Sequence, residues 1–185
     1  MVKAARNLLI GAAVATTFLL IWHPAAQAME LTSPEFSGGA SLALAQVNSR
    51  CGGGNVSPAL NWSGAPAGTR SYALTLFDSD ANHGHGFWHW LVVDIPAAVA
   101  GLPAGAGSGN GQPPGARQAE NDFGDHAYDG PCPPPASGAH HYEFTLYALG
   151  SPSTPQDPQT NDAALAAYLK SHALATASLV GLYKR

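Results

Sequence analysis

The stretch GHGFWHWLVVDIP, residues 84–96, sets the pattern from which the fold is inferred. Its part from His89 to Ile95 is dense in leucine and valine, and Pro96 follows. A short apolar run of this kind is typical of a strand that is buried on both faces, and a proline commonly ends such a strand. We therefore expect a buried β-strand over residues 89–95.

Three other segments also have strand patterns. Residues 71–78 (SYALTLFD) and 141–149 (HYEFTLYAL) alternate along the chain, and the short segment LNW occupies residues 60–62. Within residues 141–149, one predicted face carries Tyr142, Phe144, Leu146 and Ala148. The opposite face would carry Glu143, Thr145, Tyr147 and Leu149. Residues 101–115 are so rich in glycine and proline that we expect irregular structure there.

Near the end of the chain, the spacing of apolar residues changes from that of a strand to that of a helix. Residues 162–172 place Leu165 and Leu169 at helical spacing, and alanine dominates the rest. We expect a helix there, and a second helical turn or two over residues 175–182. Strands first and helix last predict a mainly β fold with a C-terminal helix.

The N-terminus has the features of a secretory signal peptide. Two basic residues precede an apolar run over residues 8–21, and the small-x-small sequence AQA stands at residues 26–28. The run is short for a membrane span, which needs roughly 20 residues, although an uncleaved anchor is the alternative. We expect a signal peptide over residues 1–28 and a single domain over residues 29–185.

The charge of the chain argues against one class of partner. The sequence has 8 Lys and Arg against 12 Asp and Glu, a net charge of −4. Removal of the signal peptide also removes Lys3 and Arg6, which leaves six basic and twelve acidic residues and a net charge of −6. No basic stripe is present, and phosphate backbones need clustered Lys and Arg. Nucleic acid is therefore not an expected partner.

The predicted export bears on the redox state of the two cysteines. In an oxidising compartment, Cys51 and Cys132 are expected to form a disulfide, because the chain has no other cysteine. Two unrelated buried thiols are the alternative. Neither cysteine has the spacing of a metal ligand.

Polar side chains gather where the predicted strands begin or end. Asp78, Ser79 and Asp80 stand at the end of one strand, and His89 begins the next. A third polar segment, residues 121–142, leads into the last strand. Strand ends that bring Asp and His to a shared rim are good places for a small polar site.

Four motifs in these segments together resemble a known family. They are Asp-x-Asp-Ala at 78–81, His-Trp-x-Val-x-x-Ile-Pro at 89–96, Tyr-x-Gly-Pro-x-Pro-Pro at 128–134 and His-x-Tyr-x-Phe at 140–144. In this order they resemble the phosphatidylethanolamine-binding proteins, and more closely the bacterial Raf-kinase-inhibitor-like branch. The resemblance spans nearly all of residues 29–185. It implies a large antiparallel sheet packed on a smaller one, with helix at the C-terminus.

The resemblance also implies a small cavity at one end of the strands, which takes phosphate-like or carboxylate anions. Carried over by position, its ligand-binding residues would be Asp78, Asp80, His89, Gly130, His140 and Tyr142. Its walls would be shaped in part by Trp90 and Pro131.

The chemistry of these residue types suits an anion. The imidazoles of His89 and His140 can each donate a hydrogen bond, and backbone N–H groups around Gly130 can approach closely because no Cβ intervenes. Asp78 and Asp80 would accept hydrogen bonds that fix the histidine tautomers, or would hold a head-group amine.

Departures from the family pattern put the ligand preference in doubt. Ser79 and Asn82 stand where prolines are usual, which suggests a looser rim. His141 stands where many members have arginine, which would remove a fixed positive charge near the mouth.

Other side chains near His89 also need an interpretation. Trp88 and Trp90 alternate about it along the strand, so both rings are expected to face away from it and to pack. His83, His85 and His89 have spacing that could hold zinc, but the first two lie between glycines in a loop and no fourth ligand is near. We expect no metal and no cofactor.

The leading hypothesis is an exported, non-catalytic binding protein for a small phosphorylated or carboxylated anion, with a kinase- or protease-inhibitor-like role as one form of it. One alternative is a hydrolase that uses Ser79 as nucleophile with nearby His and Asp. The chain lacks the Gly-x-Ser-x-Gly pattern of many hydrolases. Another alternative is a protein-interaction module, or a homodimer, with a disused cavity.

Overall fold

The computed structural model describes residues 28–154 and 162–185; the predicted signal peptide lies outside these ranges except for Ala28. The described strands form two antiparallel sheets. The larger sheet, in the order β6-β4-β3-β7-β8, consists of β3 (Ser71–Asp78), β4 (Phe87–Pro96), β6 (Arg117–Gln118), β7 (His140–Leu149) and β8 (Ala173–Tyr183). The smaller sheet, in the order β1-β2-β5, consists of β1 (Glu30–Thr32), β2 (Leu60–Ser63) and β5 (Gly101–Leu102).

Helices are few and short in the described part of the chain. They are α1 (Ala81–Gly84), α2 (Asp162–His172) and the 3₁₀ turns η1 (Ser49–Cys51) and η2 (Ala106–Ser108). None of these described helices is long and apolar enough to cross a membrane.

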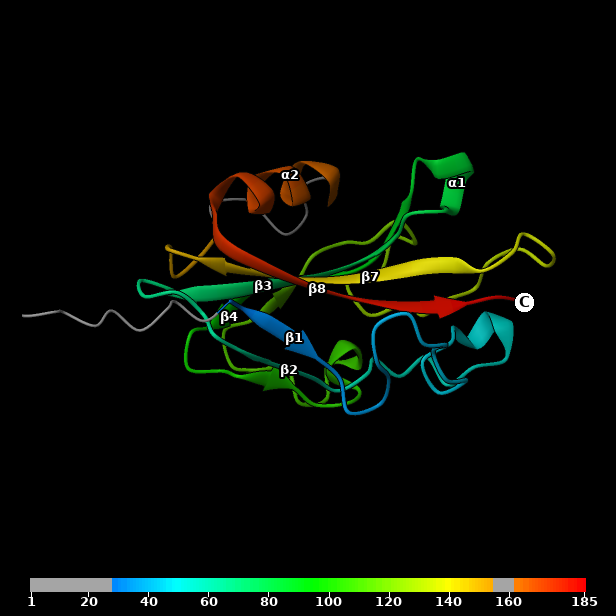
Figure 1. The fold of residues 1–185 in the computed structure, drawn as a ribbon, viewed down its shortest axis with the longest axis horizontal. Coiled ribbons are helices and arrows are strands. Elements are labelled where there is room, and N and C mark those ends of the chain that lie inside the picture. The colour runs from blue at the N-terminus through cyan, green and yellow to red at the C-terminus, as the bar shows by residue number, and fades with distance from the viewer. Residues whose placement is uncertain (1–27, 155–161) are drawn as a thin grey trace, which may run out of the picture.

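The elements stack in three layers, with the large sheet in the middle (Figure 1). One face of this sheet packs on the small sheet through a core that includes Leu60, Trp62, Leu74 and Phe144. Its other face packs against α2 through a second core that includes Leu165 and Leu169. The alternation predicted for residues 141–149 is confirmed: Tyr142, Phe144, Leu146 and Ala148 belong to the first core, and Tyr147 and Leu149 to the second.

The expected large elements are present, with one error. Strands β2, β3, β4 and β7 lie where strands are predicted, and α2 spans the predicted residues 162–172. The second helical segment predicted over residues 175–182 is wrong, because this segment belongs to β8. It pairs with β7 along its length, from His140 opposite Tyr183 to Leu149 opposite Ala173. Cross-strand pairing therefore overrides the helical preference of its alanines.

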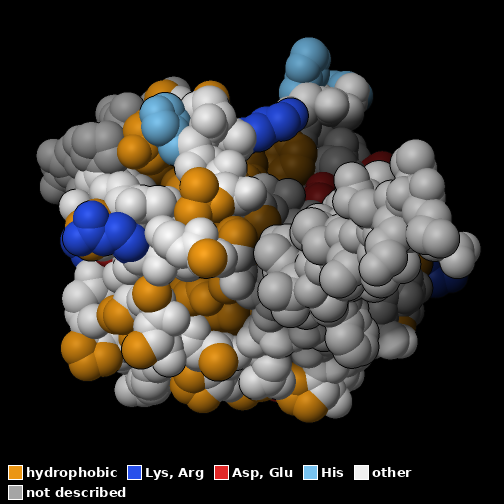
Figure 2. All heavy atoms as spheres, turned by 60° about the vertical axis from the view of Figure 1, so that its left-hand side comes forward, with side chains coloured by type: hydrophobic (Ala, Val, Ile, Leu, Met, Phe, Trp, Pro, Cys, Tyr) orange, Lys and Arg blue, Asp and Glu red, His pale blue; other side chains and the backbone are white. Residues whose placement is uncertain are grey.

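Charged side chains are sparse on the surface. The face drawn in Figure 2 shows basic side chains as isolated patches among polar and hydrophobic ones, without a continuous stripe. This distribution agrees with the low content of charged residues, 11% of the sequence.

The first residue of α2 carries a carboxyl group with an altered affinity for protons. Burial, together with a hydrogen bond to Asp122 and the nearby charges of Asp122 and Glu120, raises the pKa of Asp162 to about 6. The folded state thus holds this proton more tightly than the unfolded chain does. The free energy of unfolding is therefore expected to decline as the pH rises from about 4 to about 6, and this loss persists at higher pH.

Replacing Asp162 with asparagine is expected to remove that decline. The variant should melt at a higher temperature than the wild type near about pH 7.5, and at nearly the same temperature near about pH 3.5. Thermal unfolding followed by circular dichroism at both values measures this. Asp125→Asn serves as the control, because Asp125 is exposed and pairs only loosely with Arg50, at 4.0 Å. A difference between Asp162→Asn and wild type that is equal at both pH values would contradict the prediction.

Candidate functional site

The ends of three adjacent strands, β3, β4 and β7, lie together at one end of the large sheet. In antiparallel neighbours, the last residue of one strand lies beside the first residues of the next. Asp78, the last residue of β3, is therefore opposite Phe87 at the start of β4 and opposite Tyr142 near the start of β7. Residues more than sixty positions apart in sequence come together here.

A β-bulge in β4 directs the side chain of His89 toward this end of the sheet. Leu76 pairs with Trp90 and Phe77 pairs with Trp88, so His89 has no partner of its own on β3. An extra residue of this kind bends the strand and redirects a side chain. Both tryptophans pack, as predicted, but on different faces of the sheet. Trp90 belongs to the core between the two sheets, and Trp88 packs against the core between the large sheet and α2.

The strand ends and the loop before β7 enclose a cavity of about 610 Å³. Five of the six predicted ligand-binding residues line it, namely Asp78, Asp80, His89, His140 and Tyr142. The predicted wall residues Trp90 and Pro131 do not line it; their place is taken by other side chains, among them Phe87, Phe123, Pro133 and Pro134. The lining contains no Lys or Arg.

The sixth predicted ligand-binding residue, Gly130, has a different role. It does not line the cavity, and its backbone N–H donates to Oδ1 of Asn55 at 2.8 Å, so this group is not offered to a ligand. A Cβ on Gly130 would lie 1.9 Å from the carbonyl oxygen of Gln46. The glycine is therefore required by the close approach of two backbone segments, and its role is to position the loop.

Asp78 is the buried acceptor at the centre of the site. Its Oδ1 accepts the backbone N–H groups of Asp80 at 3.0 Å and Ala81 at 3.2 Å, and its Oδ2 lies 2.8 Å from Nδ1 of His140. One carboxylate thus fixes both the turn after β3 and the orientation of a histidine.

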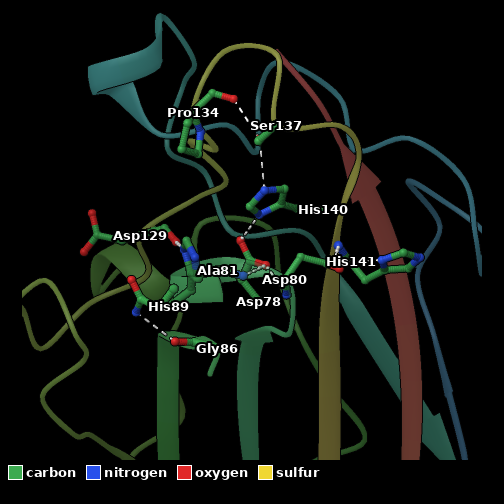
Figure 3. A network of polar contacts seen from close by, with 11 residues as sticks. Asp78, Asp80, Ala81, Gly86, His89, Asp129, Pro134, Ser137, His140 and His141 are labelled. Carbon is green, nitrogen blue, oxygen red and sulfur yellow. Dashed lines mark hydrogen bonds and ion pairs between the residues drawn. The ribbon is translucent and has the colours of Figure 1, made fainter. Parts of the chain in front are cut away.

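His140 has contacts on both ring nitrogens. Besides the contact with Asp78, its Nε2 lies 3.0 Å from Oγ of Ser137, and this hydroxyl also donates to the carbonyl oxygen of Pro134 at 2.8 Å (Figure 3). The ring nitrogen of His140 that faces away from Asp78 is thus already in contact with Ser137. A ligand would have to displace Ser137 to reach that nitrogen.

His89 has one nitrogen engaged. Its Nδ1 lies 2.7 Å from the carbonyl oxygen of Asp129, which can only accept, so Nδ1 carries the proton and Nε2 is the remaining site. The carboxylate of Asp129 is itself held by side-chain amides of Asn48 and Asn121, each at 3.0 Å. Burial lowers the pKa of His89, although the contact with Asp129 opposes this change. The imidazole is consequently neutral at pH 7.

Tyr142 contributes a hydroxyl group with unused bonding capacity. The residue is 0% exposed, and its hydroxyl makes no hydrogen bond of normal distance and angle among the described residues. Burial, the charge of Asp78 and the hydrogen-bonding influence of this nearby carboxylate raise the pKa of Tyr142, so the group is a neutral phenol that can donate. Buried polar groups in proteins are nearly always paired, so this hydroxyl is a candidate contact for a water molecule or a ligand oxygen in the cavity.

A second Asp–His pair lies at the exposed rim. Asp80 accepts from the backbone N–H of His141 at 2.7 Å, and its Oδ2 lies 2.8 Å from Nδ1 of the same residue. Burial alone would raise the pKa of Asp80, but these contacts with His141 outweigh it, and the pKa is lowered. His141 thus supplies a partner for this carboxylate at the rim.

The positions of Ser79, His83 and His85 bear on the two alternatives from the sequence, a serine hydrolase and a zinc site. Ser79 is exposed and does not line the cavity, and no hydrogen bond joins its hydroxyl to a histidine within the described ranges. His83 lines the cavity and His85 does not. In residues 28–154 and 162–185, no three or more His, Cys, Asp or Glu side chains are placed to hold a metal ion.

Sequence reasoning missed four residues of the site. Phe87 and Phe123 form an aromatic wall with rings 4.7 Å apart, Asp129 fixes the tautomer of His89, and Ser137 contacts His140. Only the serine had a signal in the sequence, because it stands three residues before a histidine already singled out.

The predicted disulfide is present and borders the site. Cys51 and Cys132 are joined, with Cα atoms 5.6 Å apart, and Cys132 lines the cavity. The bond ties the loop before β7 to η1. The guanidinium of Arg185 also reaches Sγ of Cys51.

Comparison with known proteins agrees with this architecture. A family model described as phosphatidylethanolamine-binding protein matches residues 32–184. The UPF0098 protein YbcL of Escherichia coli is 42% identical over 163 residues, which cover 86% of this chain and 89% of the relative. Its crystal structure, described as a new member of the mammalian PEBP family, superimposes with a TM-score of 0.82 and covers 86% of this chain and 99% of that one.

Two further relatives extend the comparison. The UPF0098 protein YbhB of Escherichia coli is 39% identical over 158 residues, covering 84% of this chain and 99% of the relative. A putative lipoprotein, LppC of Mycobacterium tuberculosis, is 41% identical over 127 residues, covering 68% of this chain and 58% of the relative. The family match over most of the chain, the identity of these relatives and the two-sheet fold lead to one conclusion: the chain belongs to the phosphatidylethanolamine-binding protein family.

Proposed function

We propose that the protein is an exported binding protein whose cavity takes the phosphate or carboxylate group of a small anion. The single observation that carries the proposal is the buried hydroxyl of Tyr142, which makes no hydrogen bond of normal geometry among the described residues and lines the same cavity as His89. A ligand oxygen would accept from the Tyr142 hydroxyl, and also from Nε2 of His89 once this nitrogen is protonated. Export is supported by the predicted signal peptide, by the disulfide and by the name of the lipoprotein relative.

The charges of the cavity determine how an anion would bind. Because no Lys or Arg lines the cavity while Asp78 and Asp80 do, an anion has no fixed positive charge to meet it. The positive charge has to come from a histidine, and His89 is neutral at pH 7 in the free protein. An anion beside His89 would raise its pKa again, so binding takes up a proton. Affinity should therefore increase as the pH falls.

Two ligands separate the two parts of this proposal. Isothermal titration with phosphorylethanolamine, against a chloride control, tests whether the cavity binds an anion. Sulfate tests the proton uptake, because sulfate does not titrate in this range. We expect sulfate to bind more tightly near about pH 5.5 than near about pH 8. Equal affinity at the two values would contradict the role given to His89.

Replacing Tyr142 with phenylalanine should have opposite effects on stability and binding. The free protein should become more stable by about 1 kcal/mol, because a buried unpaired hydroxyl is removed. The affinity for phosphorylethanolamine should fall about tenfold, because the ligand loses a donor. Urea denaturation and calorimetry measure the two effects. Tyr168→Phe, on α2 and away from the cavity, is the control. Unchanged affinity in Tyr142→Phe would refute the proposed position of the ligand.

A further inference from the structure

Three side chains of the cavity form a continuous chain of contacts. Oγ of Ser137 lies 3.0 Å from Nε2 of His140, and Nδ1 of the same ring lies 2.8 Å from Oδ2 of Asp78 (Figure 3). His140 and Asp78 are buried, whereas Ser137 is exposed at the mouth. Nucleophilic serine sites are recognised by this sequence of contacts and not by the order of the residues in the chain.

We propose that the protein hydrolyses a small carboxylic ester, with Ser137 as the nucleophile, His140 as the general base and Asp78 as the positioning residue. This inference adds a covalent step to the binding proposed above, and departs from the sequence expectation of a non-catalytic protein. It also moves the nucleophile from Ser79, which the sequence suggested, to a serine that contacts a histidine.

The reaction uses only the ester and water. Oγ of Ser137 attacks the acyl carbon while its proton passes to Nε2 of His140, and the bond to the alcohol oxygen breaks as that proton is delivered to the leaving alcohol. Water then attacks the acyl-serine with His140 as base, which releases the acid and restores the serine. Asp78 accepts from Nδ1–H throughout and holds the ring with Nε2 toward the serine.

The same cavity holds a candidate donor for the negative oxygen that develops during the attack. Among the described residues that line the cavity, Tyr142 is the one with a buried side-chain atom that lacks a partner. Neutral hydroxyl donors of this type can stabilise an oxyanion. The ester itself is neutral and needs no Lys or Arg in the lining, whereas the acid that its hydrolysis releases is a carboxylate of the kind that the cavity is proposed to bind. The aromatic rings of Phe87 and Phe123 offer an apolar wall for a short acyl group.

The hydroxyl of Ser137 has a second contact, which is consistent with a purely structural role for this serine. It donates to the carbonyl oxygen of Pro134 at 2.8 Å, a bond that could simply hold the loop before β7 in place. A hydroxyl has one proton and donates to one acceptor at a time, so transfer to His140 requires the hydroxyl to turn from the carbonyl oxygen of Pro134 toward Nε2. A purely structural serine would not react covalently, and this difference is what the experiment measures.

The purified protein is treated with a fluorophosphonate probe, and the modified residue is located by peptide mass spectrometry. We expect modification of Ser137 in the wild type and in Ser79→Ala, and none in Ser137→Ala. Hydrolysis of para-nitrophenyl acetate should follow the same pattern, with the Ser137→Ala rate at least about tenfold lower. Replacing Ser79 leaves the contacts of Ser137 in place, so it is the matched serine control.

Two results would overturn the proposal. One is the absence of any labelling together with ester hydrolysis that is equal in wild type and Ser137→Ala. The other is labelling at a residue other than Ser137. Phosphorylethanolamine binding is measured separately on Ser137→Ala, whose cavity keeps Tyr142 and His89. Failure of the hydrolase proposal can thus be told apart from failure of the binding proposal.

Discussion

Replacing Asp78 with alanine is expected to lower the free energy of unfolding by about 3–5 kcal/mol, the largest effect of any single change at the site. The carboxylate is 2% exposed and accepts from two backbone N–H groups and from His140. Its removal would leave all three donors without their partner at a buried strand end, and each unpaired buried donor carries the full cost of its lost hydration.

Urea denaturation of Asp78→Ala against the wild type measures this effect. Asp80→Ala is the matched control, because Asp80 is two residues away and exposed, and its contacts with His141 are at the rim. An exposed pair of this kind contributes about 0–1 kcal/mol. Equal loss in the two variants would show that Asp78 is not the central acceptor.

Removing the disulfide is expected to lower the free energy of unfolding by about 4 kcal/mol in the chain-entropy model. Cys51 and Cys132 are 81 positions apart, so the bond closes a long loop and strongly restricts the unfolded chain. The double variant Cys51→Ser with Cys132→Ser should therefore unfold at a much lower urea concentration than the oxidised protein.

Reduction provides the internal control for this prediction. Dithiothreitol should destabilise the wild type to a similar extent and leave the double variant unchanged. Because Cys132 lines the cavity, the double variant should also bind phosphorylethanolamine less tightly. A double variant as stable as the oxidised wild type would contradict the entropic account.

The sequence was a good guide to the larger elements for a local reason. In β7, alternating Tyr142, Phe144 and Leu146 specify a strand face through contacts that repeat every second residue. In α2, leucines four positions apart specify a helical face in the same way. The segment from residue 175 to 182 forms a strand where a helix is predicted, because alanine and leucine fit both periods. Its pairing with β7, which sequence spacing does not encode, decided the matter.

The polar site was only partly readable from sequence. The family resemblance indicated Asp78, His89 and Tyr142, and the structure brings them to one cavity. It also indicated Gly130, whose requirement for glycine is real but comes from the backbone of Gln46 lying against it. A glycine that approaches a ligand and one that approaches another segment look alike in a sequence.

The sequence by itself determined the strand-rich fold, the helix over residues 162–172 and the resemblance to the family, because these follow from local periodicity and ordered motifs. Only the tertiary structure decided the direction of His89, which depends on a bulge against β3, and the unpaired state of the Tyr142 hydroxyl. It also decided the alignment of Ser137, His140 and Asp78. Antiparallel pairing carries Asp78 across 62 positions to His140, and such contacts arise from the register of whole strands and not from neighbouring residues.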